Sequence, residues 1–144
     1  MIGPFSKTIT INAPVDSVWK ALTDKVLIQQ WMSETPIEIV TDWTVGGSFI
    51  IRGKHYKVPF ENKGTVLQYE AGVALEYSHL SSISRLKDEP GNYTSIAFKL
   101  EPSGSQTTLL FTASNFPTET IYKHLAFYWN VTLEKIKKQV EAAE

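Results

Sequence analysis

The hydrophobic pattern near the N-terminus changes from period two to helical spacing. Apolar and polar residues alternate over residues 5–11, which predicts a β-strand. Pro14 suits the first turn of a helix, where its missing N–H group is not needed, and apolar residues then recur at three- and four-residue steps over residues 15–22. Thr23 and Asp24 can end that helix and cap a second short one. This part of the chain therefore predicts one strand followed by two short helices.

Residues 37–113 predict about six strands, because apolar residues alternate with polar ones along most of this stretch. Clusters of glycine, proline and small polar residues predict the turns, at residues 46–47, 71–72, 88–92 and 102–105. Pro59 lies inside one apparent strand, so we expect an edge, a bulge or a loop there.

The C-terminal part of the chain predicts a long amphipathic helix that begins near Thr118. Apolar residues recur at helical spacing over about five turns, at Tyr122, Leu125, Trp129, Leu133, Ile136 and Val140. Strands followed by a segregated helix favour an α+β fold with an antiparallel sheet. We predict one domain over residues 1–144, with a curved sheet of six to seven strands wrapped around the C-terminal helix and two short helices after the first strand.

A strongly twisted sheet of this size curls, and a single helix about 10 Å wide does not by itself fill its concave face. The order of elements therefore predicts a space between sheet and helix that can hold a small hydrophobic or aromatic molecule. The same rings can instead form an ordinary core, and the sequence leaves both readings open. The predicted ligand-binding residues are Trp31, Phe49, Ile51, Phe60, Tyr77, His79, Phe98, Phe111, Tyr122, Leu125 and Trp129.

His79 is the most informative polar residue in this set. Alternation places it on the same side of its strand as Leu75 and Tyr77, so it faces the concave side or the mouth of the space. It can hydrogen-bond a ligand, act as an acid or base near neutral pH, or bond to backbone or water at a strand end. The hydroxyl groups of Tyr77 and Tyr122 need partners when buried, so they are further candidate polar anchors.

Charged residues gather around the irregular segment that contains Pro59, namely Arg52, His55, Lys57, Glu61 and Lys63. They predict either a lid that recognises a charged ligand group or a solvated loop, which is the usual location of such residues.

Composition excludes several classes of function. The formal net charge of −1 provides no long-range attraction for nucleic acid or anionic lipid. The chain has no cysteine, so disulfides and thiolate chemistry are excluded. The N-terminus does not resemble a secretory signal and no apolar run is long enough to insert in a membrane, so a cytoplasmic protein is expected. The three histidines lack metal-ligand spacing, and glycine-rich phosphate loops and the GxSxG motif are missing, so no metal or nucleotide cofactor is expected.

Several short segments, in their order along nearly the whole chain, resemble one known superfamily. They are INAP at residues 11–14, VWKALTD at 18–24, Trp31, GGSF at 46–49, GTV at 64–66, LEY at 75–77, TLLFT at 108–112 and WNVTLEKIK at 129–137. The chain resembles the START-like, SRPBCC or Bet v 1-like superfamily with its helix-grip fold. Within it, the chain is most similar to the branch of activators of 90-kDa heat shock protein ATPase homologues. It departs from that branch at Ala113, where a histidine is frequent, and at His79, where a tryptophan is usual.

The resemblance implies the fold more specifically than the activity. Its members include lipid carriers, hormone binders, polyketide cyclases and co-chaperone domains. Three hypotheses follow: a binding or carrier protein for a small hydrophobic ligand, a cyclase-like enzyme that uses His79, and a module that binds a chaperone or another protein.

Overall fold

The computed structural model describes residues 2–144, apart from the side chain of His55. Its strands are β1 (Phe5–Ile11), β2 (Ile37–Val40), β3 (Ser48–His55), β4 (Val58–Glu70), β5 (Ala74–Ser81), β6 (Thr94–Ser103) and β7 (Gln106–Ser114). Its helices are α1 (Val15–Thr23), α2 (Lys25–Met32) and α3 (Glu119–Ala142), and two short 3-10 turns cover Ser82–Ser84 and Pro90–Asn92. These elements confirm the predicted α+β helix-grip fold.

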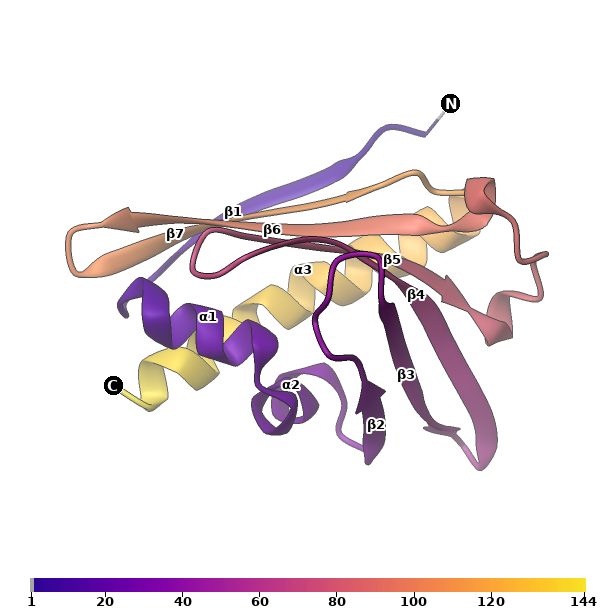
Figure 1. Ribbon diagram of the computed structural model, residues 1–144, viewed down its shortest axis with the longest axis horizontal. Helices are drawn as coiled ribbons and strands as arrows, with labels where there is room; N and C mark the ends of the chain where they lie inside the picture. The colour runs from indigo at the N-terminus through magenta and orange to yellow at the C-terminus, as the bar shows by residue number, and fades with distance from the viewer. Residues whose placement is uncertain (1) are drawn as a thin grey trace.

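The strands form one antiparallel sheet in the order β1-β7-β6-β5-β4-β3-β2. Figure 1 shows α3 running beneath the sheet, with α1 and α2 beside its C-terminal half, and β2, β3 and β4 turning away from the other strands. We call these three strands the arm, and we count the adjoining residues of β5 as part of its concave face. The sheet therefore has a concave face towards α3 and a convex face on the opposite side.

The arm bends away where β4 and β5 cannot pair regularly. A Cβ atom on Gly64 would lie 1.7 Å from the carbonyl oxygen of Ser78, so only glycine allows this approach. The Thr65 N–H donates to the Ser78 hydroxyl at 2.9 Å, and the register shifts between Val66 and Gln68. A shift of this kind increases the local twist and bends the strand.

Pro59 lies within β4, opposite Lys54 of β3. The pairing of β4 with β5 includes Asn62 opposite Ser81 but does not extend to Pro59. Its missing N–H group therefore interrupts no ladder with β5, and of the three predicted alternatives, an edge, a bulge or a loop, the structure shows the edge.

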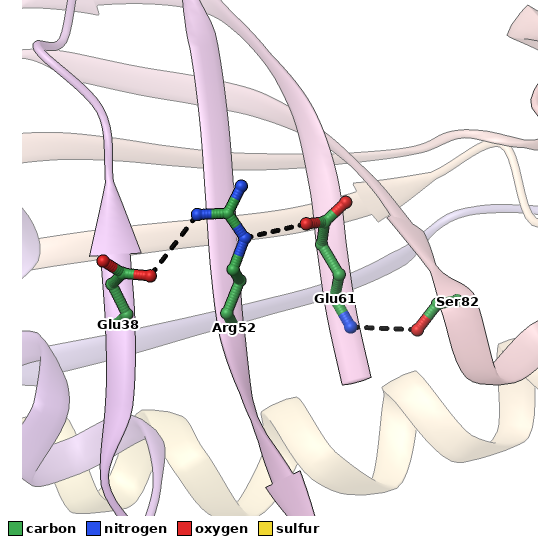
Figure 2. Close-up of polar contacts among 4 residues, drawn as sticks. All are labelled: Glu38, Arg52, Glu61 and Ser82. Atoms are coloured by element: carbon green, nitrogen blue, oxygen red, sulfur yellow. Dashed lines mark hydrogen bonds and ion pairs between the residues drawn. The ribbon is translucent and has the colours of Figure 1, made fainter. Parts of the chain in front are cut away.

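Arg52 ties the arm together on its convex face, as Figure 2 shows. Its Nε donates to Glu61 at 2.8 Å and its Nη1 donates to Glu38 at 3.3 Å, so one guanidinium links β2, β3 and β4. These hydrogen bonds raise the pKa of Arg52. The backbone N–H of Glu61 donates to the Ser82 hydroxyl at 2.9 Å, which attaches the next segment of the chain.

Helix α3 begins at the predicted cap, because the Thr118 hydroxyl accepts a hydrogen bond from the Ile121 N–H at 3.1 Å. Near its C-terminus, Lys137 Nζ donates to the Thr10 carbonyl at 2.7 Å and to Glu141 at 2.6 Å. Glu141 in turn accepts the Asn12 N–H at 2.7 Å. The last turns of α3 therefore bind backbone groups at the end of β1.

Candidate functional site

Most of the predicted ligand-binding residues fall into two groups, a deep group and an arm group, and Tyr122 and Leu125 lie apart from both. The deep group consists of Trp31, Phe98, Phe111 and Trp129, whose rings pack against one another. Trp129 stacks on Phe111 at 4.8 Å between ring centroids, and it meets Phe98 at 5.7 Å and Trp31 at 6.0 Å. All four side chains are buried. Rings at these separations leave little free volume between them, so the deep group has the character of a packed core.

The arm group lies on the concave face of β3, β4 and β5 and comprises Phe49, Ile51, Phe60, Tyr77 and His79. Phe49 and Tyr77 stack with their centroids 4.1 Å apart, and both are buried. Phe60 and His79 are partly exposed.

Tyr122 and Leu125 come from the N-terminal half of α3. The ring of Tyr122 packs edge-on against Phe116 at 5.0 Å, whereas Leu125 is buried in the core. Tyr122 is therefore held at the beginning of α3 by an apolar neighbour, and its hydroxyl makes no hydrogen bond within residues 2–144.

Asn62 is the polar residue of the arm whose surroundings are most unusual. It lies directly opposite Ile51 on β3 and opposite Ser81 on β5. Residues opposite one another in an antiparallel pair share a face, so Asn62 shares the concave face with the buried Ile51. Its Oδ1 atom is buried and has no hydrogen-bond partner in the described part of the chain. An unpaired buried acceptor costs about 1–3 kcal/mol.

His79 lies on the same face, two residues before Ser81. Its imidazole makes no hydrogen bond to any residue that the structure describes. Burial lowers its pKa from 6.5 to about 4, and the neighbouring His124 of α3 adds to this effect. The ring is therefore neutral at pH 7, with one nitrogen that donates and one that accepts a hydrogen bond.

Two tyrosines complete the polar surroundings. Burial raises the pKa of Tyr77 above its usual value, and the neighbouring Tyr128 adds to this effect. The pKa of Tyr128 is raised to about 12, again by burial, and its hydroxyl donates to the Met32 carbonyl at 2.8 Å. We call Asn62, Tyr77 and His79 the inner polar cluster. At neutral pH it offers uncharged donors and acceptors, which can hold a ligand or accept and return a proton.

An open hollow lies next to the arm, between the α2–β2 connection and the β3–β4 hairpin. We call it the hairpin hollow, and it is lined by Met32, Ser33, Glu34, Thr35, Pro36, Arg52, Gly53, Lys54, Tyr56, Lys57 and Pro59. Tyr56 and Lys57 form the hairpin turn with φ of 49° and 69°, a left-handed backbone that disfavours residues other than glycine. Of the charges predicted near Pro59, Arg52 and Lys57 therefore line this hollow.

Phe60 stands between the hairpin hollow and the inner polar cluster. A Cβ on Gly53, which lines the hollow, would lie 2.9 Å from the Phe60 ring. Phe60 also packs against the buried core, and it is two residues from Asn62 on the same strand. The Phe60 ring is therefore adjacent both to the lining of the hollow and to the strand that carries Asn62.

The residues that the structure describes include no group of three or more histidine, aspartate or glutamate side chains that could hold a metal ion. None of the helices within residues 2–144 is both long and apolar enough to cross a membrane.

Sequence reasoning did not select Asn62, His124 or Tyr128 as site residues. Alternation already places Asn62 on the face of Phe60, so its polar character on that face was an available signal. His124 and Tyr128 are one helical turn apart on α3, but the apolar stripe of that helix does not show that they approach β5.

Comparison with known proteins identifies the relatives of this chain. The profile of the family described as Activator of Hsp90 ATPase homolog 1-like protein matches residues 12–141. The solution structure of ChR145 from Cytophaga hutchinsonii is 31% identical, with 99% of this chain and 98% of that chain covered and a TM-score of 0.83. No curated protein matches the chain.

Two further structures share the fold at lower identity. The Aha1 dimer from Colwellia psychrerythraea is 23% identical, with 98% of this chain and 97% of that chain covered and a TM-score of 0.74. CalU16 from Micromonospora echinospora is also 23% identical, with 95% of this chain and 73% of that chain covered and a TM-score of 0.72.

Proposed function

Because the chain belongs to the family of Activator of Hsp90 ATPase homolog 1-like proteins and has a helix-grip fold, we propose that it binds a small apolar or aromatic molecule. The binding site is the concave face of the arm, between β3–β5 and the N-terminal half of α3. The observation that carries this proposal is the buried Oδ1 atom of Asn62, which has no partner among the described residues and shares its face with Phe49, Ile51 and Phe60. A bound molecule would supply the missing partner and recover its cost.

The apolar part of such a ligand would contact the rings of the arm group. Phe49 and Tyr77 present a stacked pair, and Phe60 lies further along the same face, four residues before Gly64, which pairs with Phe49. Aromatic faces of this kind favour flat or apolar ligands, with a few polar groups fixing orientation. The hairpin hollow, with Phe60 at its inner end, provides the route of entry.

The proposal is tested by amide NMR shifts on addition of naphthol, which is largely apolar, uncharged near neutral pH and able to donate to the Asn62 oxygen. Shifts that cluster on β3, β4, β5 and the start of α3 would support it. Asn62→Phe should abolish them by filling the site, whereas Gln68→Phe on the same strand should not. Native mass spectrometry of freshly purified protein would then reveal any retained natural ligand. Absence of amide shifts at saturating probe, together with an empty native spectrum, would overturn the proposal.

A second candidate function is association with another copy of this chain through the outer face of α3. Phe127 is 74% exposed and Val131, one turn later, is 41% exposed. Exposed apolar pairs of this kind occur at protein interfaces, and the relative from Colwellia psychrerythraea is described as a dimer. Sedimentation of the protein and of Phe127→Ser tests this candidate. A monomer at all concentrations would exclude it, and a dimer that Phe127→Ser dissociates would support it.

A further inference from the structure

Two polar side chains on the concave face of the arm have no hydrogen-bond partner among the described residues and are diagonal neighbours across β4 and β5. Asn62 is opposite Ser81, and His79 is two residues from Ser81 on the same face of β5. Diagonal neighbours across an antiparallel pair have their Cβ atoms about 7 Å apart or less. A single small group of a ligand can therefore contact both the Asn62 amide and the His79 imidazole.

The cationic side chains Arg52 of β3 and Lys63 of β4 are paired with carboxylates away from Asn62 and His79. Arg52 is paired with Glu38 and Glu61 on the convex face. Lys63 is paired with Asp88 of the segment that follows β5. A carboxylate placed beside Asn62 and His79 would lose its hydration without a cation to replace it, which is strongly unfavourable. Because His79 is neutral in the absence of a ligand, we expect the group that the ligand presents here to be neutral.

The donors and acceptors of Asn62 and His79 also limit which neutral group the ligand can present. The Oδ1 atom of Asn62 only accepts, and a neutral imidazole has one donating and one accepting nitrogen. A hydroxyl group can donate to Asn62 while it accepts from His79, so it satisfies both residues at once. An ether of the same shape cannot donate and leaves the Asn62 oxygen unpaired.

We propose that the ligand is a hydroxylated apolar molecule, a phenol or an alcohol, whose neutral hydroxyl is held between Asn62 and His79. This inference rests on the proposed function, because it names the polar group of the molecule bound at the same site. The aromatic or aliphatic body of the ligand contacts the stacked pair of Phe49 and Tyr77, which lies on the same face, with Tyr77 two residues from His79.

Three probes of matched shape test this assignment: naphthol, methoxynaphthalene and naphthoate, each titrated near neutral pH by calorimetry. We expect naphthol to bind about tenfold more tightly than methoxynaphthalene, since only naphthol satisfies the buried acceptor. Naphthoate should bind most weakly. Asn62→Leu should reduce naphthol to the affinity of methoxynaphthalene, whereas Gln68→Leu should leave the preference intact.

His79→Leu provides a second variant that does not depend on the folding of Asn62→Leu, and it should also remove the preference for naphthol. Equal affinities of naphthol and methoxynaphthalene would overturn the hydroxyl assignment and leave the proposed binding function standing. Failure of all three probes to bind would count against both. Tightest binding of naphthoate would also overturn the assignment and would point to the lysines of the hairpin hollow, Lys54 and Lys57, as the ligand's partners.

Discussion

His79 makes the stability of this protein depend on pH in a defined window. Its pKa is lowered from 6.5 to about 4 by burial and then by the proximity of His124. Asn62 of β4, Tyr77 of β5 and Thr94 of β6 also surround it, and none of them carries a charge at these pH values. Protonation therefore favours the unfolded chain. The contribution of neutral His79 to the free energy of unfolding is complete above pH 6.5 and falls as the pH drops towards 4. Below that pH it does not change further.

The size of the effect follows from the two pKa values. At about 1.4 kcal/mol per pKa unit, the difference between 6.5 and about 4 corresponds to about 3 kcal/mol of unfolding free energy. The ring is partly exposed, so solvent screening makes this an upper value. Between about pH 7 and about pH 4.5, we expect a loss of about 2 kcal/mol that originates at His79 alone.

The assay is urea unfolding, followed by tryptophan fluorescence, of the natural protein and His79→Gln at those two pH values. Glutamine does not titrate, so the variant should lose about 2 kcal/mol less than the natural protein. Asp42, Asp88 and Glu141 have pKa values lowered by hydrogen bonds or ion pairs. They contribute equally to both proteins, so their effect cancels in the comparison.

His124→Gln serves as the control, because His124 is exposed and influences the pKa of His79 only as a neighbour. It should retain most of the pH dependence. Equal losses of stability in the natural protein and His79→Gln would refute the reasoning, since they would show that His79 has the same pKa in the folded and unfolded states.

Three further predictions concern the fold and the route of entry. Gly64→Ala should lower the free energy of unfolding in urea by about 3 kcal/mol, because its Cβ meets the Ser78 carbonyl oxygen. Gly91→Ala, which has open space around its Cβ, should change the stability little, and equal effects of the two substitutions would contradict the account of the bend. Phe60→Ala should accelerate binding of methoxynaphthalene in stopped-flow measurements by opening the hairpin hollow inward, and an unchanged rate would exclude that route. Thr118→Ala should destabilise the protein by about 1 kcal/mol through loss of the α3 cap, which urea unfolding measures, and an unchanged midpoint would show that the cap is dispensable.

Much of the fold could be predicted from the sequence, because periodicity is a local property. The caps of α2 and α3 at Asp24 and Thr118, the alternation in the strands and the helical stripe each depend on residues only a few positions apart. Because the sequence predicted only one long helix, that helix was the element expected to cover the concave face of the sheet. The local rule that proline cannot donate to a ladder limited Pro59 to an edge, a bulge or a loop, and the pairing of β4 decided between them.

The site was less predictable because it depends on contacts between distant residues. Trp31 and Phe98 could line a space or fill it, and the packing of Trp129 against them decides between the two. The position of Trp129 relative to these rings cannot be deduced from neighbouring residues in the sequence. The isolation of Asn62 depends on which residues β4 and β5 place around it. The approach of His124 to His79 depends on how α3 crosses the sheet.

The position of β1 in the sheet has a consequence for the way the chain folds. The first strand pairs only with β7, with Phe5 opposite Ala113, and α3 then binds the backbone of Thr10 and Asn12. Both sets of partners lie far along the sequence, so β1 lacks the strand partner that the structure shows until β7 has left the ribosome. Contacts of such large sequence separation form late and slow the rate of folding. During that interval the apolar face of an unpaired strand is exposed, which makes synthesis a stage at which this protein is open to aggregation and to capture by chaperones.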